Sequence, residues 1–305
     1  MLPGIASRIR FKETNRLSSV LGIIGFPIGH SISPIFQQAA LDHCGIDATY
    51  QAWAVAPAEI ADFVHDLRRP EVLGINVTVP HKEAVFAHLD EVDEWATEAG
   101  AVNTIVNREG RLTGHNTDGY GFLQALKDGA GFDPNGRRVL VLGAGGAARG
   151  VVLALVRAGI SQLLIANRTV ARAENLVRLA LARGIPAQAI PLAWNEVSLG
   201  AVQADLIVNS TTIGMVHGPN AMGTPLLMHQ IPPTSLVYDL VYNPMETPLL
   251  REAARAGAGV LGGIQMLVHQ GAASFEMWTG KSAPVAVMLA AAARAMSTMS
   301  DGDGA

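Results

Sequence analysis

The sequence is poor in the residues that hold disulfide-bonded or metal-bound domains together. Its 305 residues include one cysteine, Cys44. Aromatic residues are also few, at 5% of the chain. A single cysteine cannot form a disulfide within the chain, and no spacing around it is typical of a metal site. We therefore expect a buried thiol in a reducing cytoplasm and no bound metal. The 49% hydrophobic composition is sufficient for a large apolar core instead.

Positive charge and long apolar runs are also scarce. The 22 lysines and arginines are spread along the chain and the formal net charge is -4, so the sequence offers no basic stripe for nucleic acid. Arg157 and Arg294 interrupt the two richest apolar runs, which stay below the ~18 residues of a membrane span. The N-terminus lacks the apolar segment of a secretory signal. We expect a cytoplasmic protein with neither nucleic acid nor membrane as a partner.

What the sequence does have is an alternation of strand and helix patterns, without internal repeats. Strands are predicted at 20–24, 50–55 and 74–79, with helices at 34–44 and 57–67. A more strongly apolar strand at 139–142 begins a second series, with strands at 162–166, 204–209 and 236–240. Two helical patterns, 264–278 and 284–296, follow without another strand. This order predicts an α/β fold with mostly parallel sheets.

A glycine-rich segment, Gly143-Ala144-Gly145-Gly146-Ala147-Ala148, separates a predicted strand from a predicted helix. In this context the pattern G-x-G-x-x-G/A binds dinucleotides. Gly143 permits a tight turn, Gly145 lets a pyrophosphate approach the backbone, and Ala148 lets the helix pack closely. The free N–H groups at the helix N-terminus then receive the anion. A glycine turn without a ligand is the alternative.

The end of the next predicted strand, Asn167-Arg168-Thr169, favours NADP(H) over NAD(H). Enzymes that use NAD usually have an acidic residue here, against the ribose 2′-hydroxyl. Arg168, with Arg172 shortly after it, would instead attract a 2′-phosphate. The two arginines could also be solvated charges at the start of a helix.

Polar residues gather where strands are predicted to end, which is where open α/β sheets bind ligands. They fall in the segments 30–34, 76–82, 103–104 and 116–119. Their hydroxyls, amides, amine and carboxylate suit a small polyhydroxylated carboxylate. Each segment also has a plain structural interpretation. Ser33 could be only a helix N-cap before Pro34, residues 116–119 only a turn, and Lys82 only a solvated lysine.

The chain resembles the shikimate dehydrogenase family over residues 20–296. The segments that carry the resemblance are GFPIGHSISP, GINVTVPHK, EAGAVNTI, GHNTDGYGF, LGAGGAARG, ANRTVARA, VNSTTIGM, DLVYNPMETPLL and GGIQMLVHQGAASFEMWTG. One such segment would be a weak signal, but so many in one order are specific. Gln37-Gln38 and His269 depart from residues often found in the family, at positions without a predicted chemical role.

The resemblance implies NADPH-dependent reduction of 3-dehydroshikimate to shikimate, a step toward chorismate and the aromatic amino acids. It places the catalytic pair on Lys82 and Asp118, with Lys82 donating the proton that the new alcohol requires. The substrate residues that it implies are Ser31, Ser33, Asn76, Thr78, Asn103, Tyr242 and Gln270. Nicotinamide is expected near Leu240, Gly263 and Met266.

Two domains are expected. Residues 18–118 would form an N-terminal, mostly parallel α/β substrate domain, completed by the C-terminal helices 265–297. Residues 119–264 would form a Rossmann domain that binds NADP(H). The ends, 1–17 and 298–305, are expected to be flexible. The oligomeric state stays open between a monomer and a homodimer.

Three other functions remain possible on the sequence alone. A quinate/shikimate dehydrogenase of catabolic type is one, and Ser31, Ser33 and the missing acid favour shikimate and NADP(H) over it. A non-catalytic NADP-binding sensor or scaffold would keep the fold, although the retained Lys82 and Asp118 argue against it. Methylene-tetrahydrofolate dehydrogenase shares a two-domain layout but would not explain the paired serines.

Overall fold

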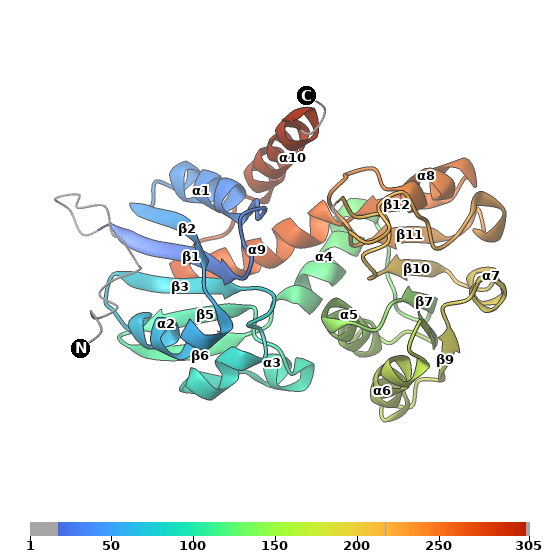
Figure 1. The fold of residues 1–305 in the computed structure, drawn as a ribbon, viewed down its shortest axis with the longest axis horizontal. Coiled ribbons are helices and arrows are strands. Elements are labelled where there is room, and N and C mark those ends of the chain that lie inside the picture. Colours follow the sequence, from blue (N-terminus) through green and yellow to red (C-terminus); the bar gives the residue numbers. More distant parts are fainter. Residues whose placement is uncertain (1–17, 217, 303–305) are drawn as a thin grey trace.

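The computed structural model describes residues 18–216 and 218–302, which form two α/β lobes connected by long helices (Figure 1). The segments 1–17 and 303–305, for which flexibility was predicted, lie outside the described residues. The remainder of the predicted flexible tail is helical, because α10 continues from Val285 to Gly302. Ser297 and Thr298 bond to carbonyls one turn earlier, at Ala293 and Arg294, so polar residues do not end this helix.

The first sheet is mixed, with the strand order β2-β1-β3-β5-β6-β4. Its strands are β1 (Ser19–Gly25), β2 (Ala48–Ala54), β3 (Val72–Val77), β4 (Glu91–Val92), β5 (Thr104–Arg108) and β6 (Arg111–His115). The parallel order that was predicted holds for β1, β2 and β3, whereas β5 runs antiparallel to both β3 and β6. The β5–β6 turn, Glu109-Gly110, has positive φ at both residues, as a two-residue hairpin turn requires.

Helices from both ends of the chain cover the first sheet. They are α1 (Ser33–His43), α2 (Ile60–Asp66), α3 (Glu94–Ala99), α9 (Ile264–Thr279) and α10, with 3-10 turns at Pro57–Glu59 and Ala84–His88. α10 packs against α1 and α9, and Phe36, Phe275 and Met288 are buried in their shared core. The predicted return of the C-terminal helices to the first lobe is therefore confirmed.

The second sheet is parallel throughout and has the order β12-β11-β10-β7-β8-β9. Its strands are β7 (Arg138–Leu142), β8 (Gln162–Asn167), β9 (Ala187–Pro191), β10 (Leu206–Asn209), β11 (Leu236–Asp239) and β12 (Gly259–Gly262). Numbered from β7, this is the 3-2-1-4-5-6 order of the Rossmann fold, as predicted. The connecting helices are α5 (Gly146–Arg157), α6 (Val170–Leu181), α7 (Trp194–Ala201) and α8 (Pro248–Arg255), with a 3-10 turn at Met228–Gln230.

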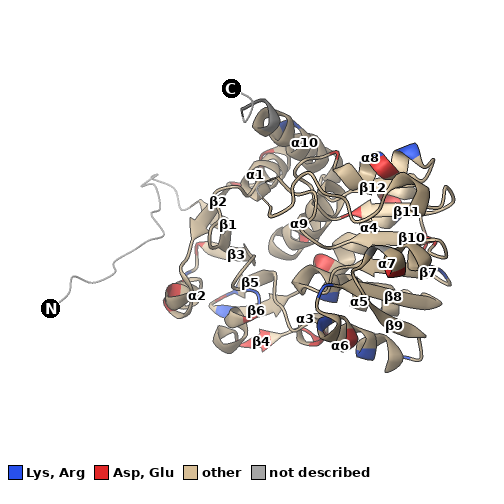
Figure 2. Ribbon diagram, turned by 45° about the vertical axis from the view of Figure 1, so that its right-hand side comes forward, with Lys and Arg blue, Asp and Glu red and all other residues tan. Residues whose placement is uncertain are grey.

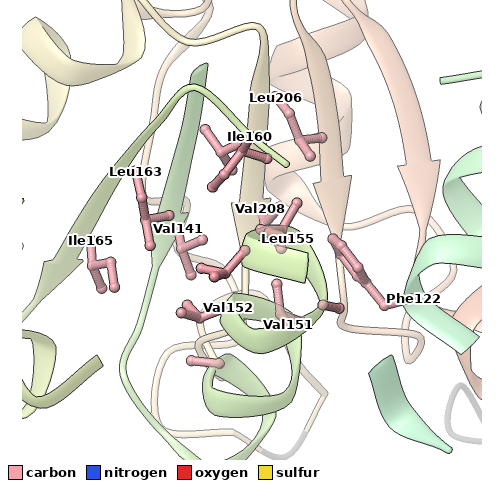
Figure 3. Packing of buried hydrophobic residues seen from close by; sticks show 14 of the residues in the cluster. Phe122, Val141, Val151, Val152, Leu155, Ile160, Leu163, Ile165, Leu206 and Val208 are labelled. Atoms are coloured by element: carbon pink, nitrogen blue, oxygen red, sulfur yellow. The ribbon is translucent and has the colours of Figure 1, made fainter. Parts of the chain in front are cut away.

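The strands of the second sheet are apolar on both faces because helices cover both. On one face Val141 and Val208 meet Val151 and Leu155 of α5, and Phe122 reaches the same core from outside the lobe (Figure 3). Burial of this helix face fixes the N-terminus of α5 at the carboxyl edge of β7. That edge faces the first lobe.

Two helices connect the lobes, α4 (Asp118–Ala130) and α9, and they pack against each other between the two sheets (Figure 1). Their approach is close at Gly121, where an added Cβ would lie 2.6 Å from the backbone nitrogen of Gln270. Glycine is therefore needed here to let the first turn of α4 and the middle of α9 meet. The domain limits predicted at 118/119 and 264/265 fall at the starts of these helices and stay predictions.

Candidate active site

A cavity of 210 Å³ lies between the lobes and is lined from both of them. Most of its lining residues are those for which a role was predicted: Ser33, Asn76, Thr78, Lys82, Asn103, Asp118, Ala147, Leu240, Tyr242, Gly263, Met266 and Gln270. Three apolar side chains that were not predicted, Ile23, Val77 and Leu267, complete the lining. Polar groups from one lobe thus face the predicted nicotinamide residues of the other.

The strand directions explain why these polar segments meet. β1 and β3 are parallel and end at the cavity, and the residues that follow them include Ser33 and Lys82. Because β5 runs the other way, Asn103 and Thr104 reach the same edge at its amino end. The expectation that this pair follows a strand was wrong. β6 reverses direction again, so that Asp118 follows its carboxyl end.

Lys82 and Asp118 form an ion pair in the lining of the cavity. Lys82 Nζ lies 2.6 Å from Asp118 Oδ2, and the two side chains are 28% and 15% exposed. The Asp118 carboxylate also accepts a hydrogen bond from Asn103 Nδ2 at 2.8 Å. The backbone N–H of Asp118 donates to Asn116 Oδ1 at 3.0 Å. Lys82 is consequently a held side chain with its ammonium turned to the cavity, and not a freely solvated lysine.

The Asn103 amide has a defined orientation. Its Oδ1 accepts the backbone N–H of Thr117 at 2.8 Å and the Thr104 hydroxyl at 3.0 Å. Since a backbone N–H can only donate, the amide nitrogen must face the other way, toward Asp118 and Gln270 Oε1. The side chain therefore links the Asp118 carboxylate to α9.

Asn76 is buried and bonded within the protein. Its Nδ2 donates to Ser274 Oγ at 2.9 Å and to Thr104 Oγ1 at 3.2 Å, while its Oδ1 accepts the Tyr50 hydroxyl at 2.7 Å. Burial raises the pKa of the Tyr50 phenol, which therefore stays a donor. Sequence reasoning missed Tyr50 and Ser274. Ser274 lies one helical turn after Gln270, which is a usable signal, but nothing local indicates Tyr50.

The two serines occupy the start of α1. Ser33 is buried and lines the cavity, and Ser31 Oγ accepts the Ser33 N–H at 3.3 Å. The N-cap residue is Ile32, so the interpretation of Ser33 as an N-cap was wrong by one position. Ser33 is instead the first residue of the helix, followed by Pro34. Its hydroxyl is placed where the N-terminal N–H groups of a helix attract an anion.

The glycine turn fits a dinucleotide. Gly143 has φ +105, and a Cβ there would lie 2.7 Å from Ser210 Oγ, so glycine is required. A Cβ on Gly145 or Gly146 would meet no described atom within 4 Å. The N-cap of α5 is Gly145, which has no side chain to cover the first N–H groups of the helix. An open, uncapped helix N-terminus is what a pyrophosphate needs.

The segment after β8 fits a 2′-phosphate. Asn167 Nδ2 donates to the Thr169 carbonyl at 2.9 Å, which shapes the turn into α6. Arg168 lies in this turn and Arg172 in the first turn of α6, and both are exposed. Two guanidinium groups without a carboxylate between them at the end of this strand favour NADP(H). Ala144 lies in the neighbouring glycine turn, and Ala147, the second residue of α5, lines the cavity.

Metal-binding groups, membrane-spanning helices and the distribution of charge bear on other kinds of site in the part of the chain that the structure describes. There, no group of three or more His, Cys, Asp or Glu side chains is arranged to hold a metal ion. No helix among residues 18–216 and 218–302 is long and apolar enough to cross a membrane. Basic and acidic residues are intermixed over both lobes (Figure 2).

Three family models match successive parts of the chain. They are the shikimate dehydrogenase substrate binding domain at residues 23–105, shikimate / quinate 5-dehydrogenase at 126–218, and the shikimate 5′-dehydrogenase C-terminal domain at 263–293. The shikimate dehydrogenase (NADP(+)) of Moorella thermoacetica is 45% identical over 289 residues, which cover 94% of this chain and 97% of that protein.

Solved structures are also similar to this chain over most of its length. Shikimate 5-dehydrogenase from Thermus thermophilus, in complex with NADP(H) and shikimate, matches with a TM-score of 0.81 at 40% identity and covers 91% of this chain and 99% of that one. Quinate dehydrogenase from Corynebacterium glutamicum, in complex with NAD, has a TM-score of 0.82 at 31% identity, with coverage of 90% and 98%. With its family models, its relatives and its cleft in agreement, the chain belongs to the NADP-dependent shikimate dehydrogenase family.

Proposed function

We propose that Lys82 and Asp118 carry the shikimate dehydrogenase reaction in the cleft between the lobes. In this reaction of aromatic amino acid biosynthesis, the C3 ketone of 3-dehydroshikimate becomes the C3 hydroxyl of shikimate, and NADPH supplies the hydride. The observation that carries the proposal is the 2.6 Å pair of Lys82 and Asp118, which lines one cavity with Leu240, Gly263 and Met266.

Lys82 acts as the general acid. The ketone oxygen gains negative charge as the carbon is reduced, and the lysine ammonium is the proton donor in the lining that can both stabilise that charge and neutralise it. After transfer, Lys82 is a neutral amine, and because its side chain is partly exposed it can recover a proton from water. Asp118 holds the ammonium in place and accepts a hydrogen bond from a substrate hydroxyl.

The remaining lining residues orient the substrate ring. The carboxylate would lie at Ser31 and Ser33, where the N-terminus of α1 favours an anion. The ring hydroxyls would contact Thr78 and Gln270. Asn76 and Asn103 would hold this wall in place, since both amides are already bonded within the protein, and each would contact the substrate by exchanging one of these bonds.

Tyr242 closes the pocket from the second lobe. Burial raises the pKa of its phenol, so the hydroxyl is a hydrogen-bond donor at neutral pH. The cofactor residues of this lobe are Gly143 to Ala147 for the pyrophosphate, and Asn167, Arg168, Thr169 and Arg172 for the 2′-phosphate. These assignments are supported by the open helix N-terminus and the exposed arginines described above.

Initial rates with four pairs of reactants test the proposal. Shikimate or quinate is oxidised with NADP⁺ or NAD⁺, and the absorbance of the reduced nicotinamide is followed. We expect the highest kcat/KM for shikimate with NADP⁺. A higher kcat/KM for quinate with NAD⁺ would assign the cleft to quinate oxidation, and cofactor binding without turnover of either acid would make the protein a non-catalytic NADP-binding module.

A further inference from the structure

We propose that Arg149 is a positioning residue that couples nucleotide binding at α5 to the geometry of the Lys82–Asp118 pair. The inference rests on the proposed function and concerns a residue that contacts neither of the two proposed catalytic side chains. Arg149 lies in the first turn of α5, where its backbone N–H donates to the Gly145 carbonyl at 3.2 Å. It therefore lies just after the turn, residues 143–147, that would bind the pyrophosphate.

The Arg149 side chain crosses from the second lobe to the first. Its Nε donates to the Ala99 carbonyl at 2.6 Å, and its Nη2 donates to the Glu98 carbonyl at 2.9 Å. These are the last two carbonyls of α3, which have no partner within the helix. A cation at this end of a helix is also favourable for the helix dipole.

The segment that Arg149 holds supports both catalytic residues. Directly after α3, the Val102 N–H donates to the Lys82 carbonyl at 2.8 Å. The Ala101 carbonyl accepts from Asn116 Nδ2 at 2.7 Å, and Asn116 Oδ1 in turn accepts the Asp118 N–H. A shift of residues 98–103 would consequently move the ammonium and the carboxylate together.

Arginine is specifically suited to this position. Its planar fork can donate to two neighbouring carbonyls at once, whereas a lysine ammonium would reach one of them without the same geometry. Gly100, the residue after Ala99, has φ +62, and a Cβ there would lie 3.7 Å from Arg149 Nε. The guanidinium is therefore packed on the turn as well as bonded to it.

A second contact between the lobes offers a matched control. The Glu98 carboxylate pairs with Arg157 at 2.5 Å and with Arg183, and the Arg157 guanidinium lies 4.3 Å from the centre of the Trp95 ring. Basic residues of α5, and one directly after α6, thus lie beside α3 where the lobes meet (Figure 2). These contacts join the lobes through side chains of α3 and leave its terminal carbonyls to Arg149.

The coupling is measured as a change in affinity. Shikimate binding is titrated calorimetrically with and without saturating NADPH, a pair that cannot react because both compounds are reduced. In the unmodified protein we expect NADPH to tighten shikimate binding by at least about 5-fold, and shikimate to tighten NADPH binding by the same factor. In Arg149→Met we expect this factor to fall below about 2-fold, while NADPH alone binds within about 3-fold of the unmodified protein.

Two further variants make the test specific. Arg149→Lys keeps the charge and should recover less than half of the coupling factor, whereas Arg157→Met should retain it. The inference is overturned if either Arg149 variant folds and keeps the full factor, if Arg157→Met loses it equally, or if the unmodified protein shows no coupling. Failure of the proposed function looks different, because the unmodified protein would then oxidise quinate with NAD⁺ more efficiently than shikimate with NADP⁺, or would turn over neither acid.

Discussion

At the scale of single residues, the proposed chemistry depends on two side chains that lie 36 positions apart in the chain and 2.6 Å apart in space. Neither is fixed by its own segment alone. Asn103 holds the Asp118 carboxylate, and Asn116 holds the Asp118 backbone. The pair is thus oriented before substrate arrives, which is the condition for efficient proton transfer.

Replacement of Lys82 tests the role of general acid. Lys82→Met should lower kcat by roughly 10²- to 10⁴-fold with a smaller change in the KM for shikimate, because the lost interaction acts mainly in the transition state. Lys127→Met, on the exposed side of α4, is the control and should retain normal turnover. Steady-state rates of both variants give the kcat values to compare. A Lys82 variant with near-normal kcat would show that Lys82 is not the general acid.

Replacement of Arg168 tests the preference for NADP(H). Arg168→Ala should raise the KM for NADPH by about 10- to 100-fold, since a hydrogen bond to a charged group contributes about 1.5–3 kcal/mol. The rate with NADH should change little. Arg178→Ala, exposed on the helix that follows, should leave both cofactors unaffected. An equal loss with NADPH and NADH would mean that Arg168 supports the turn rather than the 2′-phosphate.

The residues that sequence reasoning could predict differ from those it could not by the range of their contacts. Lys82 and Asp118 lie in polar segments that are a local signal, and Gln270 was expected from the resemblance to the family. Tyr50 reaches Asn76 from another strand of the sheet, and Arg149 reaches α3 from the other lobe. Those contacts depend on sheet register and lobe packing, which no local pattern encodes.

At the scale of elements, the contact of α4 with α9 places Asp118 and Gln270 on one side of the cavity. Gly121→Ala should lower the free energy of unfolding by about 1–3 kcal/mol, because the new methyl group would press on the backbone of Gln270. It should also weaken shikimate binding more than NADPH binding. Urea unfolding and ligand titration measure the two effects.

The control for this substitution lies on the same helix. A Cβ at Gly129 would meet the end of the Leu261 side chain, which can move, so Gly129→Ala should cost less stability than Gly121→Ala and leave shikimate affinity unchanged. Equal effects of the two substitutions on shikimate affinity would show that the closeness of α4 and α9 at Gly121 is unimportant for the site.

Asp239, at the carboxyl end of β11, should make the free energy of unfolding depend on pH. Burial raises the pKa of Asp239 to about 6, from 3.8, despite hydrogen bonds from Thr247, Val241 and Asn209. The folded state then holds more protons than the unfolded state between these values. The free energy of unfolding should therefore fall by about 3 kcal/mol through this group as the pH rises from below 4 to above 6.

The variant Asp239→Asn isolates this contribution. It cannot titrate, so urea unfolding from pH 4 to pH 7 should show a smaller loss of stability with rising pH than in the unmodified protein. The difference between the two curves, and not the absolute stability of the variant, is the quantity to compare, because the amide also disturbs the hydrogen bonds of Thr247 and Val241. Parallel curves would contradict the raised pKa.

Elements with strong periodicity were predictable, and the less regular ones were not. The apolar strands β7, β8, β10 and β11 and the glycine turn are strong local signals. The β5–β6 hairpin was not foreseen because its turn is Glu109-Gly110, whereas Asn-Gly and Asp-Gly are the usual signals for such turns. Short strands such as β4 and β12 follow from pairing with a neighbour rather than from their own residues.

At the scale of the whole molecule, the cavity exists only where the two lobes meet. In the proposed mechanism, one lobe would supply the acid and the substrate hydrogen bonds, and the other would supply the nucleotide turn together with Leu240 and Tyr242. α4 and α9 connect the lobes, and Arg149 adds a polar contact from α5 to the end of α3. Cofactor binding and substrate geometry thus both depend on the contact between the two lobes.

A crystal structure of the protein with shikimate and NADPH tests the central claim most directly. We expect the C3 hydroxyl of shikimate to lie within about 3.2 Å of Lys82 Nζ, with the carboxylate of the ring at Ser31 and Ser33. The opposite orientation, with the carboxylate paired to Lys82 and the C3 hydroxyl at the serines, would contradict the role of Lys82 as the proton donor.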